Sequence, residues 1–336
     1  MIDRTYRRRA VAVREVIRIT PLRENRSLPL VFTPTTAGVD IFSWIKSRRE
    51  LVGRHLQHRG GLLFRGFNIK SSEQLRLFIS ACTDEPLLEY TYRSTPRTQL
   101  QNRIYTSTEY PADQVIPLHN EASYANRWPG KIWFCCQTAA GTGGETPIAD
   151  SRAVYAAVPA QIRDLFIEKK IMYVRNYGPL DLSWQEVFGT RDRDEVEIYC
   201  RANHLEYQWV GEEGLRTRQV CPATLDHPGT GEPVWFNQAH LFHASNLPSS
   251  IRETLRRERG EEVFPRNAFF GDGSPIGDEM MHAIRQVYDQ LAIAEPWQVG
   301  DVMYLDNILT AHGRRPFSGE RSVLVGMTGA LNGGGA

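Results

Sequence analysis

Two stretches far apart along the chain carry side chains that can bind a divalent metal ion. His119 and Glu121 stand two apart in the run Leu-His-Asn-Glu, and His312 follows an apolar run near the C-terminus. In an extended segment side chains alternate between the two faces, so residues two apart point to the same side. Two imidazoles and one carboxylate that converge would bind the metal on one face and leave three of its positions open.

Each of these residues also has a purely structural explanation. A His-x-Glu pair can lie on the surface beside a turn, and a histidine that ends a buried strand is often hydrogen-bonded within the core. His240 and His243, three apart, could form a helical metal pair, but no acidic or thiol partner stands near them. The five cysteines are odd in number and lack Cys-x-x-Cys spacing, which predicts neither a disulfide framework nor a thiolate zinc site.

A fourth candidate, Arg321, opens an apolar run shortly after His312. A guanidinium that points inward from such a strand would bind a carboxylate through two parallel hydrogen bonds. The alternative is an exposed arginine paired with Glu320. The order of the features, His-x-Glu, then Gly-Gly-Glu-Thr at 143–146, then a late His and an Arg, is difficult to reproduce by chance.

Short strands and a few helices must position these side chains. Near-helical spacing of apolar residues predicts helices over 40–58, 72–82 and 278–294. Aromatic and β-branched content predicts the strands, which lie at 61–67, 131–137, 235–237, 299–305 and 322–328. Many short strands in the middle of the chain, with helices towards its ends, predict one α+β domain built around a β-sandwich or barrel.

Composition narrows the class of protein. The 336 residues contain neither a repeat nor a linker, which predicts a single domain over 1–336. Because 40 Lys and Arg balance 39 Asp and Glu, no net charge attracts nucleic acid or an acidic membrane. No apolar run reaches the roughly 18 residues of a membrane span, and the start has no signal-peptide pattern, so we expect a cytoplasmic protein.

Taken together, the motifs resemble those of the taurine-dioxygenase-like (TauD/TfdA) Fe(II)/2-oxoglutarate-dependent oxygenases. The chain is most similar to the clavaminate synthase/SyrP-like branch, in which Glu rather than Asp binds the metal. The matching stretches are 105–110, 117–121, 143–150, 236–238 and 312–317. The resemblance extends from about residue 60 to the C-terminal strand.

The resemblance implies a fold. It is mainly β within the α+β class, with a double-stranded β-helix (jelly roll) core over about 60–330 and flanking helices. A lid-like insertion is expected over about 181–219. Its aromatic residues Trp184, Tyr207 and Trp209 could form the lid or only a satellite core.

The resemblance also implies which residues bind the cofactors, namely Fe(II), 2-oxoglutarate as cosubstrate, and O2. By motif position, His119, Glu121 and His312 would hold the iron. Arg321 and the Thr146 hydroxyl would bind the distal carboxylate of 2-oxoglutarate. The spacing from His312 to the arginine is shorter than in clavaminate synthase, so the alternatives to Arg321 are Arg314 and Arg315.

Polar residues near the expected mouth of the site are candidates for binding substrate. Arg97 could bind a substrate carboxylate or form a structural ion pair. Asn237 could line the site or be a turn amide bonded to backbone. The complete set of substrate candidates is Asn120, Ser123, Arg97, Asn237 and Gln238.

The expected activity is hydroxylation of an unactivated C–H bond, with 2-oxoglutarate converted to succinate and CO2. The substrate would be an amino acid or a derivative of one, free or carried on a peptidyl-carrier protein, in natural-product (antibiotic) biosynthesis. Glu121 occupies the position where related halogenases have a small residue, so halogenation is not expected. The alternatives are desaturation or cyclisation within the family, a non-catalytic jelly-roll protein that binds a small acid, and zinc-dependent hydrolysis.

Overall fold

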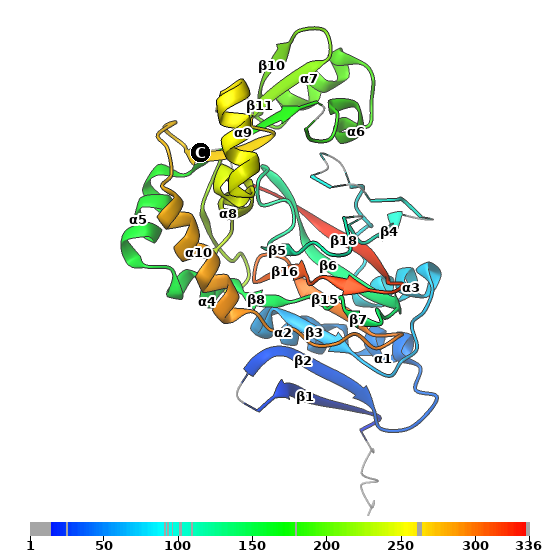
Figure 1. The fold of residues 1–336 in the computed structure, drawn as a ribbon. Helices are drawn as coiled ribbons and strands as arrows, with labels where there is room; N and C mark the ends of the chain where they lie inside the picture. Colours follow the sequence, from blue (N-terminus) through cyan, green and yellow to red (C-terminus); the bar gives the residue numbers. More distant parts are fainter. Residues whose placement is uncertain are drawn as a thin grey trace, which may run out of the picture.

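The computed structural model has a sheet-rich body with helices packed around it and a further sheet above it (Figure 1). It describes residues 15–24, 26–90, 92, 94–95, 97–100, 103–108, 110–178, 180–260 and 264–333. Within these ranges no helix is long and apolar enough to cross a membrane. All five cysteines are buried and unpaired.

A seven-stranded sheet forms the base of the fold. Its order is β1-β2-β3-β15-β6-β18-β4. The strands are β1 (Ile17–Arg23), β2 (Arg26–Pro34), β3 (Gly61–Phe64), β15 (Val302–Asp306), β6 (Arg127–Thr138), β18 (Ser322–Asn332) and β4 (Tyr105–Thr106). Strand β15 pairs with β3 and with β6, and β6 pairs with β18, all antiparallel.

Three helices cover one face of this sheet, namely α1 (Ile41–Ser47), α2 (Arg49–Arg59) and α3 (Ser72–Cys82). The side chain of Asp40 caps α1, and Gly60, in the left-handed conformation, ends α2. The core beneath them contains the stacked rings of Trp133 and Tyr304, 4.4 Å apart between centroids.

The other face of the seven-stranded sheet packs against a small sheet. That sheet has the order β5-β16-β8, with β5 (Ile116–His119), β16 (Thr310–Arg314) and β8 (Ile148–Asp150). Ile148 of β8 shares a buried cluster with Phe134 and Leu305 of the large sheet. The strands β7 (Thr142–Gly143) and β17 (Phe317–Ser318) form a separate antiparallel pair.

A third sheet and most of the other helices surround a separate apolar cluster, which lies above the small sheet in Figure 1. The sheet order is β10-β11-β9-β14. Its strands are β9 (Ile171–Tyr177), β10 (Glu206–Val210), β11 (Gly214–Cys221) and β14 (Arg266–Phe270), and β12 (Thr224–Asp226) pairs with β13 (Pro233–Trp235) nearby. The helices are α4 (Ser151–Ala157), α5 (Ala160–Lys169), α6 (Trp184–Phe188), α7 (Arg193–Ala202), α8 (Ala239–Phe242), a 3-10 turn (Ala244–Asn246), α9 (Ser249–Arg259) and α10 (Asp278–Leu291).

Most elements expected from the sequence are present, with shifted ends. The helices predicted over 72–82 and 278–294 are confirmed as α3 and α10, and the strand predicted over 131–137 lies inside β6. The helix predicted over 40–58 is two helices, because Arg48 leaves the helical conformation between them. Ile45 of α1 and Val52 of α2 are both buried in the core cluster between the helices and the sheet. The strand expected at 235–237 ends at Trp235.

The pairing of β5 with β16 depends on a close backbone approach at Gly313. A Cβ atom there would lie 2.5 Å from the carbonyl oxygen of Ile116 and 3.2 Å from the amide nitrogen of Leu118. The register of the two strands shifts next to this glycine, between His312 and Arg314. The absence of a side chain therefore lets the two strands meet.

We expect Gly313→Ala to lower the free energy of unfolding by about 1–3 kcal/mol, because the added methyl group must push β5 and β16 apart. Gly53→Ala is the matched control, since its Cβ would meet nothing within 4 Å on an exposed part of α2. That change is expected to stabilise the helix by about 0.5–1 kcal/mol. Urea unfolding of both variants measures the difference, and equal stabilities would contradict the role given to Gly313.

Candidate metal centre

Three side chains from two strands and a turn converge on one point inside the fold. His119 ends β5, and His312 lies opposite it in β16 as its register partner. Glu121 lies in the turn that follows β5, rather than in an extended strand. One ligand atom from each of the three lies within 4.8 Å of the others, and their ring or carboxylate groups are mostly buried. The three residues that the motif spacing singled out thus lie together.

The turn that carries Glu121 is held by Asn307, a residue that the sequence alone did not mark. The Oδ1 atom of Asn307 accepts a hydrogen bond from the Glu121 amide at 2.7 Å. Its Nδ2 atom donates to the carbonyl oxygens of Glu121 and Pro129 at 3.0 and 2.8 Å. Asn307 lies in the turn between β15 and β16, so one buried amide ties Glu121 to the strand of His312.

The protonation of the histidines suits a metal. The Nδ1 atom of His119 lies 2.8 Å from the carbonyl oxygen of Pro117, so it donates and leaves Nε2 as the acceptor. Burial, together with the neighbouring His312, lowers the pKa of His119 to about 4, so the ring stays neutral. Neither ring nitrogen of the buried His312 has a hydrogen-bond partner among the described residues. Leaving such atoms unpaired is costly, and a metal ion would satisfy one of them.

Glu121 is kept ionised by a buried ion pair. The Nη2 atom of Arg97 donates to Glu121 Oε2 at 2.8 Å, and both side chains are only 3% exposed. Burial alone would raise the pKa of Glu121, but the Arg97 guanidinium outweighs it and holds this pKa well below its usual range. Two imidazole nitrogens and one carboxylate oxygen fit Fe(II) as a donor set.

A small cavity opens beside the two histidines. Its lining includes Thr146 and Arg321, which the resemblance marked for 2-oxoglutarate, together with His119 and His312. Arg321 Nε donates to the carbonyl oxygen of Gly144 at 2.8 Å. Among the described residues, no carboxylate forms a salt bridge with Arg321.

Arg321 is an unusually placed cation. Burial and the nearby Arg314 lower its pKa to about 10. A second donor, Nη1, reaches the Ser107 hydroxyl at 3.2 Å. A partly buried guanidinium that is bonded only to neutral groups among the described residues favours an anionic ligand in the cavity.

The two alternatives to Arg321 are placed differently. Arg314 lines the same cavity, but its guanidinium donates to the backbone carbonyl oxygens of Tyr110, Pro111 and Gln114. Arg315 is exposed and does not line the cavity. Arg321 is therefore the arginine whose surroundings best suit an anion.

The substrate candidates are spread through the structure. Arg97 lines the small cavity. It also forms the structural ion pair that the sequence analysis offered as an alternative to substrate binding, and its partner is Glu121. Its Nε and Nη1 atoms have no hydrogen-bond partner within the described ranges. The other four line neither this cavity nor the larger one described below, and each is bonded to backbone: Asn120 to Asn307, Ser123 to Asn120, Asn237 to Ala223 and Gln238 to Asn120.

His240 and His243 form no metal pair. The Nε2 atom of His240 donates to the carbonyl oxygen of Leu118 at 2.9 Å, and that of His243 to Ile276 at 3.0 Å. The group of histidine and carboxylate ligands found in the described part of the chain is the one at His119, Glu121 and His312.

The geometry and the fold define a non-haem iron oxygenase, and comparison with known proteins identifies its family. The family model of the taurine catabolism dioxygenase TauD, TfdA family, matches residues 19–328. The chain belongs to this family and is an Fe(II)/2-oxoglutarate-dependent dioxygenase.

Two curated relatives are similar over most of the chain. The dapdiamide synthesis protein DdaC of Enterobacter agglomerans is 44% identical over 273 residues, which cover 81% of this chain and 83% of that protein. A clavaminate synthase-like protein of Arabidopsis thaliana is 29% identical over 325 residues, which cover 90% and 94%.

Solved structures show the same fold at low identity. PvcB of Pseudomonas aeruginosa has a TM-score of 0.58 and 16% identity, with 97% of each chain covered. A second structure of PvcB, described as an Fe, alpha-ketoglutarate dependent oxygenase from an isonitrile synthetic pathway, has a TM-score of 0.56 and 15% identity, with 96% of each chain covered.

His240 also makes the stability of the protein depend on pH. Burial lowers its pKa to about 3 in the folded state, whereas the unfolded chain binds this proton near pH 6.5. The free energy of unfolding should therefore fall as the pH is lowered, by about 2 kcal/mol between pH 7 and pH 5 from this residue alone. In His240→Gln the fall should be smaller by that amount. Urea unfolding of metal-free protein at the two pH values tests this, and equal slopes for wild type and variant would refute it.

Proposed function

We propose that this dioxygenase hydroxylates an unactivated C–H bond of an amino acid or amino-acid-derived substrate in natural-product biosynthesis. 2-Oxoglutarate would be converted to succinate and CO2 in the same reaction. The observation that carries the proposal is the buried cluster of His119, Glu121 and His312 beside the cavity lined by Arg321. The similarity to a dapdiamide synthesis protein supports an amino-acid-derived natural product.

In this proposal His119, Glu121 and His312 hold the iron, which activates O2 when it is bound. Contacts within the protein position the metal ligands before the metal binds. Asn307 fixes the turn of Glu121, and Arg97 fixes its carboxylate. Because these outer partners are already in place, the ligands need little rearrangement to bind the metal.

Arg321 and Thr146 bind the distal carboxylate of 2-oxoglutarate in this proposal. Both side chains line the small cavity, and Arg321 has neutral partners only among the described residues. The Thr146 hydroxyl accepts from Trp297 Nε1 at 3.2 Å, so its own hydrogen can be donated to a carboxylate. A buried cation and a hydroxyl donor in one small cavity suit one carboxylate.

The substrate roles of Arg97, Asn120, Ser123, Asn237 and Gln238 remain predictions. The two unpartnered donors of Arg97 support a contact with an anionic group. The hydrogen bonds of the other four to backbone favour a supporting role around the site. The proposal includes both a free substrate and one presented on a peptidyl-carrier protein. It also includes a cytoplasmic location, to which the five unpaired, buried cysteines are suited.

We further propose a jelly-roll core within a single domain. The packing of the β5-β16-β8 sheet against the seven-stranded sheet supports it. The segment 181–219 would then be an insertion that covers the site. Trp184 and Trp209 meet edge to face at 5.3 Å between ring centroids; Trp184 belongs to the upper apolar cluster and Trp209 packs against it, so this segment is anchored on that cluster.

The proposed activity can be measured directly with purified protein, Fe(II), ascorbate and 2-oxoglutarate. Candidate amino acids, free and bound to a carrier protein, are incubated with the enzyme, and their mass change is measured by mass spectrometry. We expect one substrate to gain an oxygen atom while succinate is released. His312→Ala should abolish both, because a metal ligand is lost, whereas His282→Ala, on an exposed part of α10, should change neither. Substrate-stimulated succinate release without a gain of oxygen would favour desaturation or cyclisation, and retained activity in His312→Ala would overturn the metal assignment.

Arg321→Ala should weaken binding of 2-oxoglutarate by about 10- to 100-fold, because a charge-assisted hydrogen bond to a buried carboxylate contributes about 1.5–3 kcal/mol. Calorimetry on the iron-loaded protein under anoxic conditions measures this affinity. Arg315→Ala is the matched control and should bind 2-oxoglutarate as wild type does, since Arg315 is exposed and lies outside the cavity. Equal affinity in Arg321→Ala and wild type would remove Arg321 from the site.

A further inference from the structure

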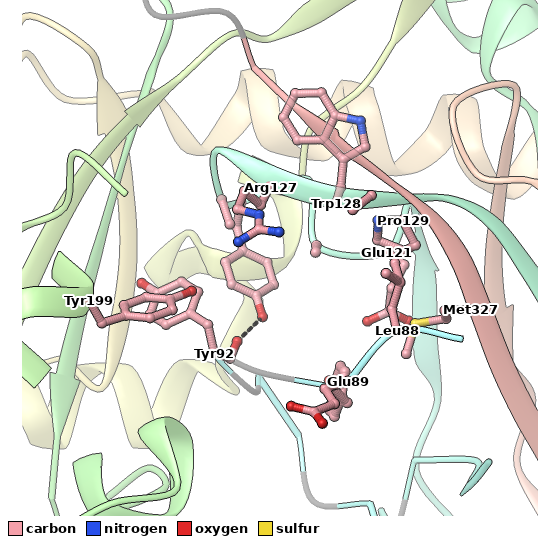
Figure 2. Close-up of a pocket in the computed structure, with 14 residues that line it drawn as sticks. Leu88, Glu89, Tyr92, Glu121, Arg127, Trp128, Pro129, Tyr199 and Met327 are labelled. Carbon is pink, nitrogen blue, oxygen red and sulfur yellow. Dashed lines mark hydrogen bonds between the residues drawn. The ribbon is translucent and has the colours of Figure 1, made fainter. Parts of the chain in front are cut away.

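A second, larger cavity of about 270 Å³ meets the metal centre at Glu121. It lies among β6, β18, residues 88–90 and 92, and α7, and Figure 2 shows its lining side chains. Glu121 lines this cavity and also belongs to the metal cluster, where its Oε2 atom is 3.7 Å from His312 Nε2. A molecule at the inner end of the cavity would therefore touch a metal ligand.

The walls of this cavity are aromatic and apolar. Tyr92 packs against Tyr124 and Tyr199 at 5.6 and 5.8 Å between ring centroids. The Tyr124 hydroxyl donates to the Tyr92 carbonyl oxygen at 2.8 Å, as Figure 2 shows, so this polar atom is already satisfied. Trp128 and Met327 add further apolar surface. Such a wall binds the aliphatic part of a ligand and leaves polar recognition to other groups.

Two opposite charges stand at the rim. Glu89 and Arg127 both line the cavity and are exposed, and Figure 2 shows Glu89 below Arg127. Glu89 Oε1 accepts from Arg103 at 2.9 Å, which orients its carboxylate without burying it. A carboxylate and a guanidinium at the rim of one cavity suit a ligand that carries an ammonium and a carboxylate group.

We propose that this tyrosine-lined cavity is the substrate chamber and that it takes a zwitterionic amino acid with an aliphatic side chain. The ammonium group pairs with Glu89 and the carboxylate with Arg127, while the aliphatic chain extends between the tyrosine rings towards Glu121. This rests on the proposed function, because it is the iron beside Glu121 that makes the inner end of the chamber reactive. It also favours a free amino acid over a carrier-bound one, since a thioester has no carboxylate for Arg127.

Four probes of equal chain length test the proposal, namely L-norleucine, L-norleucinamide, hexanoate and hexylamine. Each is titrated by calorimetry into protein loaded with Fe(II) and 2-oxoglutarate under anoxic conditions. We expect norleucine to bind about fivefold more tightly than each of the others, because an exposed ion pair contributes up to about 1 kcal/mol. Glu89→Gln should remove the preference of norleucine over hexanoate, and Arg127→Gln its preference over norleucinamide.

Matched variants separate this proposal from the proposed function. Glu206→Gln and Arg54→Gln, both on exposed surface outside the chamber, should leave all four affinities unchanged. Ala330→Trp places a large ring at an exposed part of the chamber wall and should abolish norleucine binding while 2-oxoglutarate still binds. Norleucine binding that survives Ala330→Trp, or that shows no preference over the other probes, would overturn the chamber. If norleucinamide binds as tightly as norleucine, the carrier-bound form is favoured and the role of Arg127 is wrong. Failure of the wild-type protein to bind 2-oxoglutarate would instead refute the proposed function.

Discussion

The structure around the metal centre depends on one buried carboxylate. Glu121 has little access to solvent, so its charge must be compensated within the protein. Arg97 supplies the compensating charge at 2.8 Å, and the ring of Tyr90 lies 4.4 Å from the Arg97 guanidinium. The Asn307 side chain holds the backbone of the same residue from the opposite side. The ligand set is therefore organised by the protein itself before any metal binds.

Glu121 also separates two cavities with different chemistry. The smaller one has His119, His312 and the partly buried Arg321 on its walls, and it suits a small anion. The larger one is lined mainly by aromatic rings, with Glu121 at its inner end and Glu89 and Arg127 at its rim. An enzyme that uses a keto acid and a separate organic substrate needs two such compartments that meet at the metal.

Much of the site could be predicted from the sequence because short motifs carry local geometry. His119 and Glu121 are two residues apart, and the chain between them has little freedom to separate their side chains. His312 and Arg321 are only nine residues apart, with His312 inside β16 and Arg321 directly before β18, so both lie close to the packing of the small sheet on the large one. The relation of Arg97 to Glu121 was less accessible, since 24 residues separate them and an arginine beside Ser-Thr-Pro has no local signature. The aromatic wall was missed for the same reason, because its residues come from four separate segments.

The sequence by itself determined the chemistry of the protein. Its order of histidines, carboxylate, threonine and arginine resembles that of the TauD/TfdA oxygenases, and it is this resemblance that implies iron and 2-oxoglutarate. Only the tertiary structure decided which groups compensate the buried charges. It assigned Arg314 to backbone carbonyl oxygens and left Arg321 facing a cavity. The physical reason is that the partner of a buried charge is set by where β6, β16 and β18 bring distant segments together, and no local spacing encodes that meeting.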